Sequence, residues 1–134
     1  MISLATNDFI NEIDLSELSL KDKEIKEFLH KAKNIRPIKA IKLQQNSLTD
    51  EGFESICQYL DHVSNLNLSF NHLTDRALDI ILKNKEYFYK MRIMNLSNNK
   101  ITSDKTSTKI KSKMEELKRM GIVVTLWIIN QLNK

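Results

Sequence analysis

The chain has 134 residues, 41% of them hydrophobic, a length and composition that suit one folded domain. Its formal net charge of +4 favours acidic partners in a general way without identifying one. A single cysteine excludes an internal disulfide bond, and no apolar stretch reaches transmembrane length. Residues 1–10 lack the basic start and long apolar run of a secretory signal, so we expect a cytoplasmic protein.

The first unit of the chain has a weak but recognisable pattern. We expect residues 1–14 to form an N-terminal cap. Leu15, Leu18 and Leu20 then have the spacing of a strand with one inward face, and Lys23 follows three residues after the last of them. A helix is predicted next, with an apolar stripe formed by Ile25, Phe28, Leu29 and Ala32.

A sequence motif of about ten residues then recurs at 41–50, at 66–75 and, less regularly, at 94–102. Each copy contains two apolar residues one residue apart, an asparagine three residues later, a further apolar residue and a threonine. The alternating part predicts a short strand. The asparagines are Asn46, Asn71 and Asn99. A buried amide must be hydrogen-bonded, so we expect them to form a polar ladder along the turns that leave the strands.

The threonine in each copy marks the start of a helix, and an Asp follows it directly in the first two copies. We expect Asp50 and Asp75 to act as helix caps. Apolar stripes predict the helices themselves: Phe53, Ile56, Cys57 and Leu60; Leu78, Ile81 and Leu82, continuing to 87–89; and Ile110, Met114, Leu117 and Met120. Cys57 is expected to be a buried, inert thiol, and Gly52 to allow close packing.

The last unit is again atypical. Val124 and Leu126 have the strand spacing, but Ile129 stands where the asparagine would be, and Gly121 is expected to end the preceding helix. The sequence thus predicts a single α/β domain over residues 1–134. Its repeats occupy residues 15–120, and a cap strand occupies residues 121–134.

These motifs resemble those of leucine-rich repeat proteins. The ending from Asn46 to Gly52 is similar to the ribonuclease-inhibitor-like class, although Ala77 and Lys105 replace the glycine in later copies. The resemblance implies a solenoid of about five strand–helix units with a parallel concave sheet, a helical convex face and a protein-binding role. The short chain, rich in Lys, Asn and Ile, also resembles small leucine-rich repeat effectors of intracellular bacteria such as Legionella. That second likeness implies translocation into a host cell, or inhibition of another effector.

No arrangement of residues in the sequence indicates catalysis. His30, His62 and His72 lie in different units, and none has a second ligand at metal-binding spacing. Phosphate-binding and nucleophile motifs are absent from the sequence. We therefore expect no enzyme activity, no cofactor and no metal.

Binding is expected on the outward residues of the strands and on the turns that follow them. The predicted contact residues are Lys42, Gln44, Asn67, Ser69, Phe70, Ile93, Asn95, Thr125 and Trp127. The large apolar residues among them suit a protein-binding hot spot, because the repeat does not require them there. For two of these residues a structural role stays open as the alternative to binding. Phe70 would then pack inward, and Trp127 would fold over the end of the last repeat.

A second surface is the basic helix, with Lys105, Lys109, Lys113, Lys118 and Arg119. It is either a solvated helix face or an electrostatic adaptor for nucleic acid or anionic lipid. Because no aromatic residue lies between these basic residues, nucleic acid is the less favoured partner. We expect a monomer or weak self-association through the last strand.

Overall fold

The computed structural model describes residues 11–34, 37–101 and 108–125. Its strands are β1 (Glu12–Asp14), β2 (Ala40–Lys42), β3 (Asn65–Asn67), β4 (Ile93–Asn95) and β5 (Val123–Thr125). Its helices are α1 (Asp22–Ala32), α2 (Asp50–Ile56), α3 (Arg76–Lys83) and α4 (Thr108–Arg119). Short 3-10 turns follow α2 at Cys57–Tyr59 and α3 at Lys85–Tyr87, so the second central helix ends earlier than its apolar pattern predicted.

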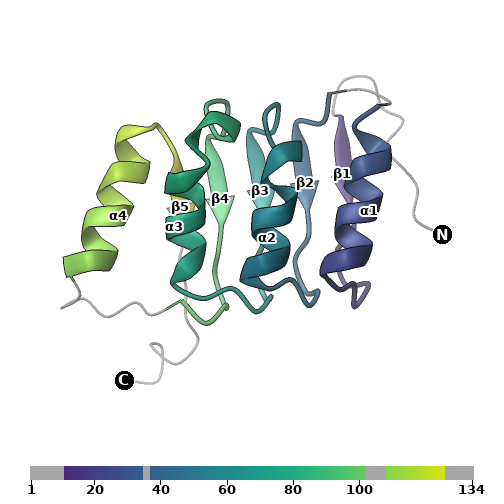
Figure 1. Ribbon diagram of the computed structural model, residues 1–134, viewed down its shortest axis with the longest axis horizontal. Coiled ribbons are helices and arrows are strands. Elements are labelled where there is room, and N and C mark those ends of the chain that lie inside the picture. Colours follow the sequence, from purple (N-terminus) through teal and green to yellow (C-terminus); the bar gives the residue numbers. More distant parts are fainter. Residues whose placement is uncertain (1–10, 35–36, 102–107, 126–134) are drawn as a thin grey trace.

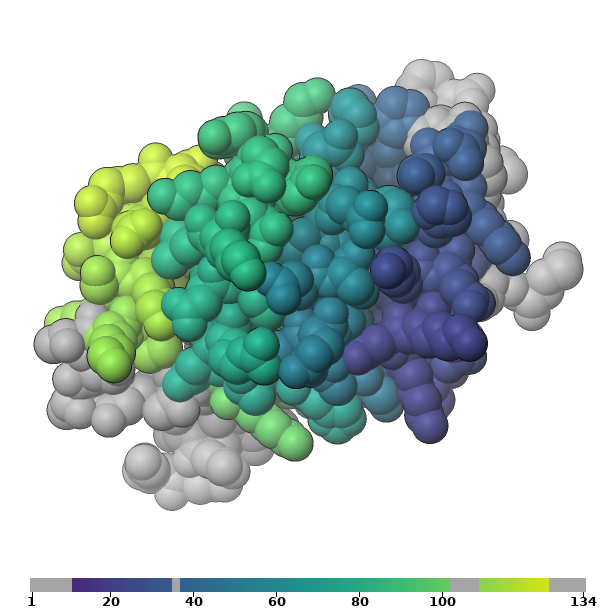
Figure 2. Space-filling model, in the orientation of Figure 1, coloured from purple at the N-terminus to yellow at the C-terminus, as the bar shows by residue number. Residues whose placement is uncertain are grey.

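The strands form one parallel sheet in chain order, and the helices cover one of its faces. Figure 1 shows α1 to α4 side by side in front of the strands. Figure 2 shows the same side with all atoms, where the side chains of the helices form a continuous layer over the sheet. The predicted α/β architecture of repeated strand–helix units is therefore confirmed.

The first repeat begins five residues earlier than predicted. Ile13 pairs with Ile41 in the sheet, so Leu15, and not Leu20, is the equivalent of Leu43 in the next repeat. Strand β1 consequently lies within the segment that was expected to be an N-terminal cap. The prediction was wrong because three leucines at 15, 18 and 20 reproduce the apolar spacing of the motif by chance.

The predicted asparagine ladder is confirmed, and it joins neighbouring repeats. Nδ2 of Asn71 donates to the backbone carbonyls of Leu43 (2.9 Å) and Leu68 (3.1 Å). Its Oδ1 accepts from the backbone N–H of Leu48 at 2.9 Å. Leu43 and Leu48 belong to the preceding repeat, so one amide satisfies buried backbone groups of two repeats. Equivalent bonds are made by Asn46 and Asn99.

Asp50 and Asp75 were predicted to cap helices, and the structure shows that this prediction was wrong. Thr49 caps α2 with its own side chain, and the buried carboxylate of Asp50 instead accepts from the backbone N–H (3.0 Å) and hydroxyl of Thr74 in the next repeat. Asp22 binds Thr49 in the same way. Asp75 lies at the N-cap position of α3, but its side chain makes no capping bond. The motif aspartates at 22 and 50 therefore form a second link between repeats.

The core lies between the sheet and the helices. The inward residues of β1 to β4 are fully buried, whereas Val124 of β5 is half-buried. The rings of Phe53 and Phe88 pack edge to face with centroids 6.3 Å apart. Cys57 lies in the same core, as predicted, and burial is the main cause that raises the pKa of its thiol to about 12. A thiol that is protonated at neutral pH is a poor nucleophile.

Replacing Asn71 with Ala is expected to lower the free energy of unfolding by about 3 kcal/mol or more, because several buried backbone groups lose their partner. Urea denaturation followed by circular dichroism measures the loss. Asn65→Ala is the matched control, since Asn65 is exposed on the adjoining strand; its effect should stay within about 0.5 kcal/mol. Equal stabilities of the two variants would contradict the ladder.

Gly52→Ala is expected to destabilise the protein by about 1 kcal/mol, although alanine normally favours a helix interior by a similar amount. A Cβ at this position would lie 2.1 Å from Oδ1 and 2.7 Å from Cβ of Asp22. The Asp22 side chain must then move and lose its bonds to Thr49. A thermal unfolding curve decides the sign, and the Thr49 amide chemical shift should change. Higher stability in the variant would contradict the close contact.

Candidate protein interface on the open sheet face

The face of the sheet away from the helices, called here the open sheet face, carries two rows of outward side chains. The observed register places Asp14 and Glu12 of β1 in these rows. One row is Asp14, Lys42, Asn67, Asn95 and Thr125, and the other is Glu12, Ala40, Asn65, Ile93 and Val123. Neighbours in a row are about 4.8 Å apart. The face is acidic at β1, rich in amides at β3 and apolar at β4 and β5.

The amides in the middle of this face are held in fixed orientations. Oδ1 of Asn67 accepts from the backbone N–H (3.0 Å) and the hydroxyl (2.7 Å) of Ser69. Oδ1 of Asn95 accepts from the backbone N–H of Ser97 at 3.0 Å. Because each oxygen is tied to the turn, each amide is held in one orientation. This pre-organisation lowers the entropy lost on binding.

Asp14 ends the same row, and its hydrogen bonds keep it charged. The hydroxyl and the backbone N–H of Ser16 donate to Oδ1, at 2.6 and 3.0 Å, and these bonds lower the pKa of Asp14, with a smaller contribution from Lys42. Because the pKa is lowered on folding, the corresponding stabilisation is present above the ordinary carboxyl pKa and is lost as the pH falls below it. The β1 end of the face therefore stays negative at neutral pH.

Not every predicted contact residue faces outward. Ser69 is only 6% exposed, and its hydroxyl donates to Oδ1 of Asn67, so its direct contact with a partner stays a prediction. Gln44 is half-buried and its Oε1 is enclosed. Lys42 is exposed, with Nζ 3.8 Å from the Glu12 carboxylate, and Thr125 is half-buried.

Two β-branched residues form an exposed apolar patch at the end of the sheet. Ile93 is 47% exposed and Val123 is 64% exposed, and the two are register partners on β4 and β5. We call this pair the Ile93–Val123 patch. Val123 was not among the predicted contact residues, although its place beside Ile93 in the outward row was the signal that could have identified it. Trp127 lies outside the described residues.

Phe70 is separate from that patch. It stands on the turn after β3, five residues beyond Asn65, which is the register partner of Ile93. Its φ is 57°, in the left-handed region, as are those of Gln45 and Asn98 at the same point of their repeats. The side chain is 44% exposed, so it does not pack fully inward. A bulky residue is uncommon in this backbone conformation, where asparagine is favoured.

The predicted basic helix is only partly available as a charged surface. Nζ of Lys113 lies 2.7 Å from the carboxylate of Asp79 on α3, so part of its charge is neutralised. Lys109, Lys118 and Arg119 are exposed, and Lys105 lies outside the described residues. The adaptor role for nucleic acid or lipid stays a prediction.

Within residues 11–34, 37–101 and 108–125, no group of three potential metal ligands comes together. His30 Nδ1 lies 3.0 Å from the Tyr59 hydroxyl, and His62 Nε2 lies 3.7 Å from Asp61. His30 and His62 thus each have a polar side-chain partner. None of the helices in this part of the chain is both long and apolar enough to cross a membrane.

Comparison with known proteins agrees with this architecture. A leucine-rich repeat family model matches residues 61–79, which include the second copy of the motif. The fold is that of a leucine-rich repeat solenoid.

The chain is similar to the structure of leiomodin-1 actin-binding site 2, with a TM-score of 0.68 and 17% identity over 88% of this chain and 69% of that one. It is also similar to a chain in the structure of Chaetomium Mex67:Mtr2 subunits, with a TM-score of 0.60 and 23% identity over 90% and 81% of the two chains. No curated protein sequence matches.

Phe70→Asn is expected to stabilise the protein by about 1 kcal/mol, because asparagine tolerates the left-handed conformation and Phe70 is 44% exposed. Asn98 already fills the equivalent position in the next repeat. Urea denaturation of wild type and variant measures the difference. A loss of stability of similar size would show instead that the ring contributes to the core.

Proposed function

We propose that the chain is a non-catalytic protein-interaction module that binds a protein partner through the open sheet face. The Ile93–Val123 patch would be the apolar anchor, and Lys42, Asn67 and Asn95 would supply polar contacts at its side. The observation that carries this proposal is the exposure of two large β-branched side chains on strands whose register is fixed. Apart from Ala40, the other residues of the two rows are polar, and aliphatic residues are normally turned into the core.

The architecture of the face supports the same proposal. Its side chains stand on strands held by the asparagine ladder, so a partner meets a surface whose geometry hardly changes on binding. One structural neighbour is an actin-binding site of leiomodin-1, and the other comes from a structure of the Mex67:Mtr2 subunits. Both are fold likenesses that fit a binding role here without identifying the partner.

Two finer roles belong to the proposal. When a partner protein binds to the sheet, the surface it uses is covered, so binding can inhibit an activity of the partner that needs that surface. The chain also resembles small bacterial effectors in length and composition, and the second role is that of an effector that acts inside a host cell after translocation. A translocation assay with a reporter fused to the full chain tests this second role.

The binding proposal is tested by affinity capture from the native cell with three baits. Wild type and Leu18→Glu are expected to retain the same partner, and Ile93→Glu is expected to lose it. Leu18 is the matched control, because it is an apolar residue with 44% exposure on the turn after β1. Both variants should keep wild-type stability to within about 1 kcal/mol, as is usual for surface positions. Retention of the partner by folded Ile93→Glu would overturn the assigned anchor.

A further inference from the structure

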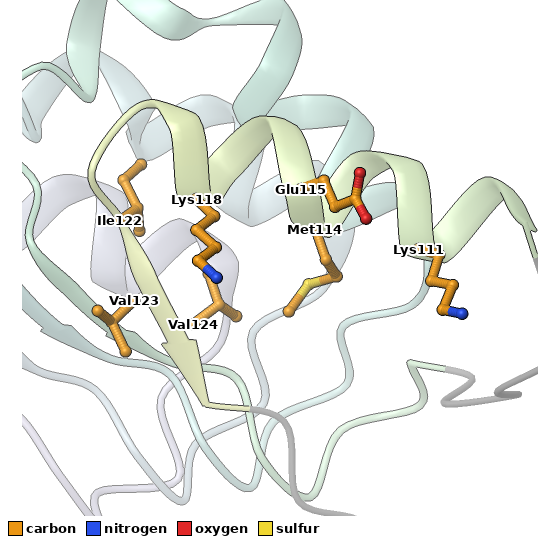
Figure 3. A pocket seen from close by; sticks show the side chains of 7 residues that line it. All are labelled: Lys111, Met114, Glu115, Lys118, Ile122, Val123 and Val124. Atoms are coloured by element: carbon orange, nitrogen blue, oxygen red, sulfur yellow. The ribbon is translucent and has the colours of Figure 1, made fainter.

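The described end of the solenoid contains an apolar groove between α4 and β5. It has a volume of about 340 Å³, at the lower end of the size range of ligand pockets. Its apolar lining comes from Met114 of α4 and from Ile122, Val123 and Val124 at β5. Figure 3 shows Val124 beside β5 and beneath Lys118, with Met114 to one side of it along α4.

The side of α4 that forms this groove is the side away from α3. Lys113 and Glu116 face the other way, toward Asp79 of α3 and toward Lys85 just after it. Helices α1, α2, α3 and α4 contact one another in sequence, each against the next. In the described part of the chain, α4 contacts no further helix on its groove side. A helix placed there would continue the stack.

The edge of the groove is positively charged. Lys111 and Lys118 lie on the same face of α4, two turns or about 10 Å apart along the helix axis, with Met114 between them. Figure 3 shows Lys118, Met114 and Lys111 following one another along α4, with Lys118 next to β5. Glu115 is the acidic residue at the edge. Helix α4 as a whole carries five basic and two acidic side chains, which disfavours a second copy of the same helix at this place and favours an acidic partner.

We propose that this groove binds an amphipathic helix of a partner protein. The helix would place aliphatic side chains between Met114 and Val124, and acidic side chains about two turns apart against Lys111 and Lys118. This is the helix-in-groove mode of recognition. The inference is independent of the open sheet face, although Val123 borders both surfaces.

The test uses the full chain and two labelled synthetic peptides of helical sequence. The first has two glutamates seven residues apart, with leucines three and four residues after the first glutamate, and the second has lysines in place of the glutamates. Fluorescence anisotropy should show that the glutamate peptide binds wild type about tenfold more tightly than its lysine twin. Its binding should also shift the methyl signal of Met114 in the NMR spectrum.

Charge exchange makes the test specific. Lys111→Glu combined with Lys118→Glu should reverse the preference, so that the lysine peptide becomes the tighter ligand. Lys26→Glu combined with Lys109→Glu changes the net charge equally at exposed positions outside the groove, and should leave the preference unchanged. Reversal by both double variants would overturn the proposal, because it would show a general charge effect.

Two further results would also overturn it. One is failure of the glutamate peptide to bind wild type, as expected if another part of this chain or a second copy covers the groove. The other is binding of duplex DNA or anionic vesicles that depends on Lys111 and Lys118 while the peptide does not bind. In that case the basic side of α4 serves nucleic acid or lipid.

Discussion

The rest of the structure depends on the hydrogen bonds of one asparagine side chain per repeat, which join the turn after each strand to the preceding repeat. Parallel strands of three residues make few backbone hydrogen bonds of their own, and the turns that follow them leave buried carbonyl and N–H groups. Asn46, Asn71 and Asn99 satisfy these groups from two repeats at once. An unsatisfied buried backbone group costs about 1–3 kcal/mol, so the repeats are stable as a stack and not singly.

This construction also sets where binding can occur. The ladder and the aspartate–threonine links fix the strands, so the outward side chains between them are free to vary without loss of the fold. In this chain they form an acidic edge at Asp14, fixed amides at Asn67 and Asn95, and an apolar end at Ile93 and Val123. The groove beside β5 arises from the same principle, because a unit that normally packs between two neighbours has only one there among the described residues.

The central repeats could be predicted from sequence because an asparagine within an apolar motif is buried, and a buried amide must be hydrogen-bonded to the backbone. The first repeat could not, since Leu18 replaces that asparagine and the leucines around it fit two registers. Asp50 was misassigned because its partner, Thr74, is remote in sequence and a helix cap is the local alternative. The groove at α4 depends on which helix face meets α3, and the pairing of Lys113 with Asp79 reveals this only in three dimensions.

Native-state hydrogen exchange at the ladder amides tests the central claim most directly. The backbone N–H groups of Leu48 and Leu73 donate to Asn71 and Asn99 at turns, where amides usually exchange through small local openings. If the ladder holds the repeats together, these two amides exchange only through global unfolding, with the same opening free energy as the core. Exchange of Leu48 and Leu73 at low opening free energy, while the strand amides stay protected, would contradict the account.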